Sequence, residues 1–506
     1  MFTLIDNFLN RVTMYRLVHY SLIVLLCIAG VLGFFGLLPY SPVSIAISSV
    51  FLVIVCWTTN KIFSYIFEAP TSSESYYITA LILACILTPI HSTHDLPLFI
   101  WAGVLSMSSK YILAVNRKHI FNPVAISVVL TAFGFGESAS WWVGNSILMP
   151  FILLGGLLIV RKIKRGDLVF SFLVAAIITT ITLGFLKGTS IALTINQLLL
   201  NSSLFFFGFV MLTEPLTTPP TKFLQILYGG LVGFLFSPQI HLGSIYSTPE
   251  LALVLGNIFS FLVSPKQKLL LYLSEKKQLG SDIIDFIFRP SKNIVFTPGQ
   301  YMEWTLPHKG VDSRGNRRYF TIASSPTEDT LRLGIRFSPK SSSFKQKMLN
   351  MNESTPIVAG QLSGDFTLPK NPHTKLVFIA GGIGVTPFRS MTKYLIDKNE
   401  SRDVVLLYSN KNISEIAYSD VFVEARNKLG MKTIYTLTDK ESIPENWSGK
   451  VGKIDAKMIQ EEVPDYHSRI FYLSGPQGMV KSFDKTLKEM GIPSSHIKKD
   501  FFPGFV

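Results

Sequence analysis

Residues 376–391 read LVFIAGGIGVTPFRSM. The run from Leu376 to Ala380 is apolar and of strand length, the next four residues are mostly glycine, and Thr386 and Pro387 open a helix. A strand, a glycine turn and a helix amino terminus present backbone N–H groups and a positive dipole end to a phosphate. The segment therefore predicts an α/β fold that binds a nucleotide.

Two further segments point in the same direction. An apolar strand is expected from Ile470 to Leu473, and the turn SGPQGM, residues 474–479, follows it. Upstream, residues 317–326 read RRYFTIASSP. In this expected strand Arg318, Phe320 and Thr321 offer a cation for a phosphate, an aromatic face for stacking and a hydroxyl for a ring nitrogen, which a flavin requires. Alternation after the turn at Pro298 and Gly299 predicts β-barrel structure around them.

These segments resemble the ferredoxin–NADP reductase superfamily, whose motifs are Arg-x-aromatic-Ser/Thr for flavin and Gly-Gly-x-Gly-x-Thr-Pro for nicotinamide nucleotide. Residues 360–366, GQLSGDF, and the acidic-x-Phe tail that begins at Asp500 are similar to further segments of that superfamily. The resemblance implies an FAD-binding antiparallel β-barrel in residues 265–375 and an NAD(P)-binding α/β domain in residues 376–506.

The resemblance also implies site residues. Those for FAD and NAD(P)H are Arg318, Tyr319, Phe320, Thr321, Ile322, Ser343, Gly364, Phe366, Gly381, Gly382, Gly384, Thr386, Pro387, Gly475, Pro476, Met479 and Phe505. Thr321, near the flavin N5, and Ser474, where many members carry Cys, are implied as catalytic residues. The choice between NADH and NADPH stays open, because one lysine, Lys411, after the strand ending at Tyr408 does not decide it.

The first 264 residues differ in composition from the rest. The mean hydropathy of the whole chain is +0.36, which is too apolar for a soluble protein of 506 residues. The apolar runs fall between residues 17 and 264, which predicts a multi-pass domain in residues 1–264. The first run is expected as a retained helix and not as a cleaved signal peptide. Cys27, Cys56 and Cys85 lie in these runs, so no disulfide framework, iron–sulfur cluster or other metal site is expected.

Ten membrane spans are predicted at the usual length of about 20 residues. They are residues 18–38, 41–57, 74–92, 96–115, 121–135, 141–160, 168–186, 197–213, 223–240 and 248–264. With a cytoplasmic amino terminus the outer loops hold one basic residue, Lys187, and the inner loops hold Arg11, Arg16, Lys61, Arg117, Lys118, Arg161, Lys162, Lys164, Arg165, Lys222, Lys266 and Lys268. The positive-inside rule then predicts a cytoplasmic membrane protein with both termini in the cytoplasm. The net charge of +14 is explained by this topology, and nucleic-acid binding is not expected.

Proline positions indicate an internal repeat. Pro89 and Pro123 lie 34 positions apart, and so do Pro215 and Pro249. In the ten-span arrangement these pairs flank the fourth and the ninth span, so the two units have opposite orientation. This pattern is typical of an inverted repeat of five helices, although proline also ends helices in general.

Residues 110–123 and 211–230 resemble the ten-helix membrane subunit shared by sodium-pumping NADH:quinone reductases and the Rnf complexes. That family carries flavin, partly on Thr in an Asp-x-x-Ser-Gly-Ala-Thr motif, which this sequence lacks. A non-covalently bound FMN or riboflavin is therefore the expected second cofactor. The membrane-site candidates are Lys110, His119, Asn122, Glu214 and Thr217, and a Lys110–Glu214 ion pair is one explanation for two of them.

The sequence favours an NAD(P)H-dependent flavin oxidoreductase that passes electrons from FAD into the membrane domain, to a quinone or an extracytoplasmic acceptor. Other electron-transfer subunits are conceivable partners. Two alternatives stay open: a transporter with a redox-sensing reductase module, and a haem-containing ferric reductase or oxidase. Haem would draw on His91, His94 and His241 or on His19 and His119, which lack paired spacing on shared helices.

Overall fold

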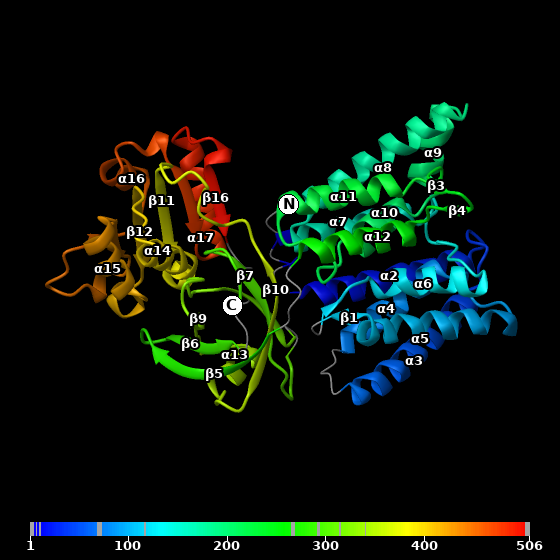
Figure 1. Ribbon diagram of the computed structural model, residues 1–506, viewed down its shortest axis with the longest axis horizontal. Coiled ribbons are helices and arrows are strands. Elements are labelled where there is room, and N and C mark those ends of the chain that lie inside the picture. Colours follow the sequence, from blue (N-terminus) through cyan, green and yellow to red (C-terminus); the bar gives the residue numbers. More distant parts are fainter. Residues whose placement is uncertain are drawn as a thin grey trace. The chain divides into compact units, whose positions relative to one another are not determined.

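The computed structural model describes residues 5–6, 8–9, 12–67, 73–115, 118–264, 269–290, 294–312, 315–339 and 341–500. The chain divides into two compact units, residues 1–268 and 269–506 (Figure 1). The first unit is helical, and the second contains an antiparallel half-barrel followed by a parallel α/β sheet. At this level the structure confirms the predicted order of folds.

The first unit consists of apolar helices joined by short connections. They are α2 Met14–Phe34, α3 Pro42–Ile66, α4 Ser73–Ile86, α5 Leu96–Ile112, α6 Pro123–Phe135, α7 Met149–Ile163, α8 Gly166–Leu186, α9 Ile191–Leu200, α10 Leu204–Phe206, α11 Lys222–Leu235 and α12 Pro249–Val263. A π-helix, Phe207–Met211, continues α10. Two short hairpins pair β1 Ala114–Val115 with β2 Lys118–His119 and β3 His241–Leu242 with β4 Ile245–Tyr246.

The helix lengths differ from those of the ten predicted spans, of which the fifth, residues 121–135, is the short one. Among the described residues three helices, α2, α3 and α8, are long and apolar enough to cross a membrane, and the pair of α9 with residues 204–211, bent by 54°, makes a fourth if it is one span. Other apolar helices are shorter, because proline starts α6 at Pro123 and α12 at Pro249. Helix α7 begins at Met149 and not at residue 141, because Trp141 has a positive φ of 52° that a helix does not accept.

Helix packing in the first unit follows the same scheme in its two halves. Helix α3 packs against α4 and α5, and α5 packs against α6. In the second half α8 packs against α9 and α11, and α11 packs against α12. The halves meet where α2 contacts α7 and where α6 contacts α12. Glycines allow the close approaches: a Cβ on Gly103 of α5 would lie 2.7 Å from a methyl carbon of Val55 in α3, and a Cβ on Gly229 of α11 would overlap the carbonyl oxygen of Leu168 in α8.

The half-barrel is a six-stranded antiparallel sheet. Its strands are β5 Leu269–Gln278, β6 Ile283–Pro290, β7 Tyr301–Thr305, β8 Arg317–Thr321, β9 Leu331–Arg336 and β10 Pro356–Ser363, in the order β8-β7-β10-β5-β6-β9. Alternating residues fill its core, among them the fully buried Trp304, Phe286 and Phe288. Helix α13, Ser343–Leu349, covers the core with Phe344 and Met348.

The α/β part is a parallel sheet covered by helices on both faces. Its strands are β11 Leu376–Gly381, β12 Val404–Asn410, β13 Lys432–Leu437, β14 Lys450–Val451, β15 Ile470–Ser474 and β16 Ile497–Asp500, in the order β14-β13-β12-β11-β15-β16. Its helices are α14 Thr386–Asp397, α15 Ser419–Leu429, α16 Ala456–Glu462 and α17 Gln477–Glu489. Phe378 of β11 packs into the core under α14 and α15, whereas Val377 and Ile379 pack into the core with residues of α16 and α17, so this central strand is buried on both faces.

Candidate functional site

The glycine turn lies between β11 and α14 at the carboxyl edge of the parallel sheet. Gly381 ends β11, Gly382 has a positive φ of 52°, and α14 begins at Thr386 with Pro387 in its first turn. A Cβ on Gly384 would lie 2.5 Å from the Cα atom of Gly475 and 2.6 Å from the carbonyl oxygen of Ser474. Gly384 is thus packed directly against the backbone of residues 474–475, so a side chain does not fit there. The turn places the amino end of α14, which can attract an anion, at this edge of the sheet.

The second predicted turn lies beside the first because β15 is the parallel neighbour of β11. Ser474 pairs with Ala380 in the sheet, and Gly475 follows with a φ of 157°. Pro476 precedes α17, and the sulfur of Met479 in the first turn of α17 touches Gly381, where any Cβ would overlap it. Two turns that are about 90 residues apart in sequence therefore form one surface.

Thr321, Ser474 and Asp500 are linked at this surface. Thr321 ends β8 of the half-barrel, and its hydroxyl donates to Oδ2 of Asp500 at 3.4 Å. Asp500 ends β16 and is the register partner of the buried Ser474 in β15. Sequence reasoning named Thr321 and Ser474 as catalytic but treated Asp500 only as the start of the acidic-x-Phe tail. The similarity of that tail is the sequence feature that could have marked Asp500 as a further candidate.

Arg318 and Ser343 lie together on the half-barrel. The guanidinium group of Arg318 stacks over the ring of Phe344 at 5.2 Å and donates to the carbonyl oxygen of Gly315 at 3.0 Å. Ser343, the neighbour of Phe344, accepts a hydrogen bond from the N–H of Asp312 at 3.0 Å through its hydroxyl. The N–H of Ser343 donates to the carboxylate of Asp312 at 3.0 Å, and this carboxylate lies 4.0 Å from the guanidinium group of Arg318. A pyrophosphate that took the place of this carboxylate would find a cation, a hydroxyl and a backbone N–H as donors.

The remaining predicted flavin residues occupy different surroundings. Phe320 lies 6.0 Å from Phe344 between ring centroids, whereas the hydroxyl of Tyr319 donates to Glu303 at 2.9 Å. The side chain of Ile322 is buried in the core of the half-barrel.

Gly364 has a φ of 119°, and its carbonyl oxygen accepts a hydrogen bond from the side chain of Gln300 at 3.3 Å. The ring of Phe366 is buried between Phe388 and Tyr472 in the α/β part, with centroid distances of 5.8 Å and 5.1 Å. Phe505 lies outside the described residues.

Four of the five membrane-site candidates form one polar cluster. The side chain of Asn122 donates to Oε2 of Glu214 at 2.8 Å, and the hydroxyl of Thr217 donates to the same oxygen at 3.3 Å. Nε2 of His119 lies 3.6 Å from Oε1 of Glu214. Asn122 also caps α6, because its Oδ1 accepts the N–H groups of residues 124 and 125.

Sequence reasoning missed two members of this cluster. Oδ1 of Asn257 in α12 accepts the backbone N–H of Asn122 at 2.7 Å, and its amide donates to the hydroxyl of Tyr228 in α11 at 3.0 Å. Both side chains are fully buried. An isolated asparagine in an apolar run gives no sign of its partner 135 residues away, and only the contact between α6 and α12 brings them together.

Lys110 belongs to a different group of residues. Its Nζ donates to the hydroxyls of Ser75 and Thr79 in α4, at 2.9 Å in each case. The Lys110–Glu214 pairing considered from the sequence is therefore replaced by separate partners for the two residues. A second unpredicted feature is Glu250 in the first turn of α12, a buried carboxylate that accepts the indole N–H of Trp141 at 2.6 Å.

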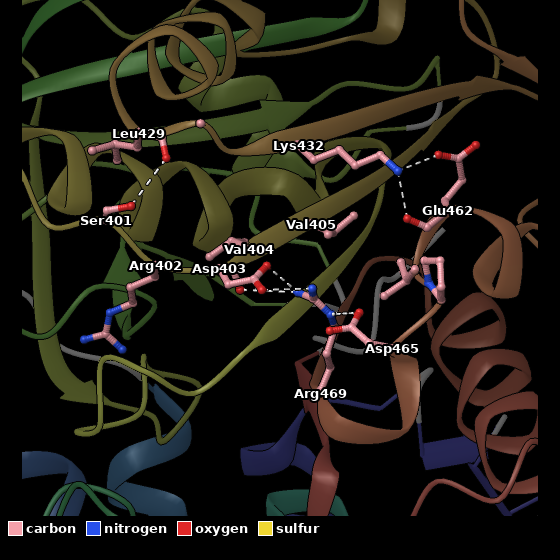
Figure 2. Close-up of a pocket in the computed structure, with 13 residues that line it drawn as sticks. Ser401, Arg402, Asp403, Val404, Val405, Leu429, Lys432, Glu462, Asp465 and Arg469 are labelled. Atoms are coloured by element: carbon pink, nitrogen blue, oxygen red, sulfur yellow. Dashed lines mark hydrogen bonds and ion pairs between the residues drawn. The ribbon is translucent and has the colours of Figure 1, made fainter.

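A pocket of about 400 Å³ lies on the α/β part, away from the glycine turns. It is lined by the first residues of β12, Val404 and Val405, and so lies at the opposite edge of the parallel sheet from the turn after β11. Figure 2 shows Arg469 between Asp403 and Asp465 in this pocket. Hydrogen bonds from Arg469 lower the pKa of Asp465 to about 2. The other two cations of the described lining are also paired, Lys432 with Glu462 and Arg402 with Glu400, so the pocket offers a nucleotide phosphate no cation without a carboxylate partner.

Comparison with known proteins bears on the second unit. Residues 378–485 match the family model described as the oxidoreductase NAD-binding domain. A flavohemoprotein of Bacillus cereus is 27% identical over 242 residues, which cover 45% of this chain and 59% of the relative. The glycine betaine monooxygenase reductase subunit of Chromohalobacter salexigens is 25% identical over 225 residues, 44% of this chain and 60% of the relative. The chain thus spans about three fifths of the length of these curated relatives.

Among solved structures, the flavohem-like FAD/NAD binding domain of nitric oxide dioxygenase from Vibrio cholerae is similar with a TM-score of 0.42 and 18% identity, covering 46% of this chain and 98% of that one. With the NAD-binding match and the half-barrel that precedes it, the second unit is an NAD(P)H/FAD oxidoreductase module of the ferredoxin-reductase type.

Proposed function

We propose that the chain is a membrane-bound NAD(P)H-dependent flavin oxidoreductase with three domains, residues 1–264, 265–375 and 376–506. Electrons from cytoplasmic NAD(P)H pass through FAD in the reductase module to a redox group in the membrane domain, and then to a quinone or an extracytoplasmic acceptor. The hydrogen bond between Thr321 and Asp500 carries the proposal, because it joins the strand with the flavin motif to the edge that bears both glycine turns.

The residues present fit both nucleotides. Arg318 and Ser343 are the donors proposed for the FAD pyrophosphate. The close contact of Gly384 with Gly475 brings the two glycine turns together at the amino end of α14, which is proposed to bind the NAD(P)H phosphates. FAD, when bound, supplies the conversion of a two-electron hydride donor into one-electron steps.

The protein's own groups then have distinct roles in this proposal. Thr321 holds its hydroxyl toward Asp500, and this carboxylate would stabilise positive charge on a nicotinamide ring bound beside it. Ser474 offers a small polar group at the same edge, and Gly475 keeps the backbone free to approach the ring.

For the first unit we propose a membrane domain of the type found in sodium-pumping NADH:quinone reductases and Rnf complexes. Large apolar side chains at its surface support a lipid environment: Phe34, Leu154, Phe170 and Leu186 are 66–77% exposed. The matched packing of α3–α5–α6 and α8–α11–α12 supports an inverted repeat, and 126 positions separate Pro89 from Pro215 and Pro123 from Pro249. The Glu214 cluster lies where the two halves meet, and a non-covalent FMN or riboflavin is the proposed second cofactor of this domain.

The absorption spectrum of the detergent-purified chain tests the proposal, before and after anaerobic NADH and then NADPH, with extracted flavins counted per chain. Two flavins that bleach together support electron transfer into the membrane domain. A flavin spectrum that neither nucleotide bleaches contradicts the proposed function. A Soret band would replace it with the haem-containing ferric reductase or oxidase.

A second candidate function is a transporter whose reductase module senses redox state. The repeated helix packing favours it, because inverted repeats are typical of secondary transporters. Turnover separates the two functions: the oxidoreductase oxidises NAD(P)H continuously when a quinone is present, and E214Q lowers that turnover without lowering the bleaching of FAD. In a sensor, NAD(P)H would bleach the FAD once, and no continuous oxidation of NAD(P)H would follow.

A further inference from the structure

Arg389 belongs to the nucleotide-binding segment, but its side chain leaves that segment. It lies three residues after Thr386, in the first turn of α14, and is only 4% exposed. Instead of facing solvent, its guanidinium group reaches the half-barrel. A buried arginine is costly unless its donors are used, so the partners of this side chain identify its role.

The first partner is the segment directly after β8, the strand that carries the flavin motif. Nη1 of Arg389 donates to the carbonyl oxygen of Ala323 at 3.0 Å. Ala323 lies two residues after Thr321, the residue that donates to Asp500. The hydroxyl of the neighbouring Ser390 donates to the carbonyl oxygen of Ser324 at 2.6 Å. Helix α14 is therefore bonded to the backbone directly beyond β8.

The second partner is Glu328, in the loop between β8 and β9. Nη2 of Arg389 donates to Oε1 of Glu328 at 2.8 Å, and Nη1 bonds the other carboxylate oxygen, so the pair is bidentate. The N–H of Ser325 donates to the same carboxylate at 2.7 Å and fixes its orientation. Desolvation opposes the charge on Arg389, yet the bonds to Glu328 outweigh it and raise the arginine pKa.

This pair is part of a larger buried network. Arg332 in β9 lies 3.5 Å from Glu328 and donates to Oδ2 of Asp285 in β6 at 3.0 Å. The hydroxyl of Tyr418, before α15, donates to the other oxygen of Asp285 at 3.0 Å. Two arginines and two carboxylates thus compensate one another. The three middle residues of the network belong to the half-barrel, and the residues at its two ends, Arg389 and Tyr418, belong to the α/β part.

We propose that Arg389 is a positioning residue for hydride transfer, which holds the nucleotide-binding turn at a fixed distance from the flavin-binding strand. The inference rests on the proposed function. The hydrogen bond between Arg389 and Ala323 lies close to both motifs. Arg389 lies three positions after Thr386, and Ala323 lies two positions after Thr321. The half-barrel and α14 are also closely packed here, because a Cβ on Gly334 of β9 would lie 3.0 Å from the methyl group of Thr386.

A purely stabilising role is the competing explanation. Replacing a buried ion pair by apolar residues is often neutral or stabilising, so stability alone does not explain a bidentate pair at this position. A reaction is slowed on the order of 100-fold when the reacting groups are misplaced by about 1 Å. Positioning therefore predicts a rate effect that exceeds any loss of cofactor or of folded protein.

The test compares R389Q, R389K and E328Q with wild type in the full chain. The matched control is K393M, which removes the ion pair between Lys393 and Asp397 at 2.5 Å on the same helix. FAD content, the dissociation constant of the preferred nucleotide and the anaerobic rate of flavin bleaching at saturating nucleotide are measured for each. Hydrogen exchange of the backbone amides of residues 322–328, measured without nucleotide, reports whether the contacts of Arg389 hold this segment. This readout does not depend on activity.

R389Q and E328Q are expected to bleach about tenfold or more slowly per bound FAD, with nucleotide affinity changed less and faster exchange in residues 322–328. R389K keeps the charge but not the bidentate geometry and should fall between R389Q and wild type, and K393M should match wild type. Wild-type bleaching per FAD in R389Q overturns the inference. If R389Q does not fold, wild-type bleaching in R389K overturns it instead. A wild-type chain that neither nucleotide bleaches overturns the proposed function itself, so the two failures are distinguishable.

Discussion

Gly384 is a residue at which the backbones of the two nucleotide-binding turns are in close contact. A Cβ there would lie 2.5 Å from the Cα atom of Gly475, and neither backbone can yield without moving its strand. We expect G384A to slow flavin bleaching by NAD(P)H about tenfold or more while FAD stays bound, because the half-barrel is unchanged. Stopped-flow absorbance with flavin quantification measures both. G478A is the control, since a Cβ on Gly478 meets nothing within 4 Å, and an equal loss in both variants would contradict the explanation.

Asp500 places a negative charge beside Thr321 at the site. D500N keeps the shape of the side chain and its contact with Thr321 but removes the negative charge. We expect the limiting rate of flavin bleaching to fall roughly tenfold to 100-fold with little change in nucleotide affinity, because the charge acts only as the nicotinamide becomes positive. The control is D484N, which removes the carboxylate that pairs with Lys499, the neighbour of Asp500. A rate in D500N equal to that of D484N would exclude an electrostatic role.

At the scale of elements, Asn122 connects a helix cap to the polar cluster of the first unit. N122A removes the acceptor that caps α6 and the amide that donates to Glu214. We expect a loss of about 2 kcal/mol in the free energy of unfolding, roughly 1 from the cap and the rest from the carboxylate left without its donor. Thermal unfolding in detergent measures it. S41A, which removes the exposed cap of α3, should cost less than N122A, and the reverse order would contradict this account.

Two carboxylates bond Arg469 at the amino ends of β12 and β15, and one of them, Asp465, makes a contribution to stability that depends on pH. Arg469, just before β15, bonds Asp403 and Asp465, and its hydrogen bond is the main cause that lowers the pKa of Asp465 from 3.8 to about 2. A lowered folded-state pKa stabilises the fold above about pH 4, and this stabilisation is lost as the pH falls toward 2.

D465N should therefore destabilise the α/β part at pH 7 by about 1 kcal/mol or less, since the carboxylate is partly exposed. The difference from wild type should shrink between pH 4 and pH 2. Pulse proteolysis in urea, read at sites between β11 and β15, measures the midpoint at each pH. A difference that grows on acidification would show that the sign of the linkage is wrong.

At the scale of the whole molecule, the sequence predicted what depends on local pattern and missed what depends on distant contacts. The strand at Leu376, the helix after Pro387 and the turn at Gly475 are local, because apolar runs, proline and glycine act on their own neighbours. The pairing of Asn257 with Asn122 depends on helices more than 100 residues apart. Hydropathy also gives no sign of where a helix starts inside an apolar segment, which is why the late start of α7 was missed.

Membrane orientation concerns the whole chain, because it decides which side the reductase module faces. Lys164, between α7 and α8, and Ser244, between β3 and β4, are both exposed and are expected on opposite sides. In a C27A background, an impermeant maleimide added to intact cells should label S244C and spare K164C until the membrane is permeabilised. The basic residues around Lys164 favour the cytoplasm, and so does the need of the module for NAD(P)H. Labelling of K164C alone in intact cells would invert the topology and remove the module from its nucleotide, and labelling of both sites would exclude a membrane between them.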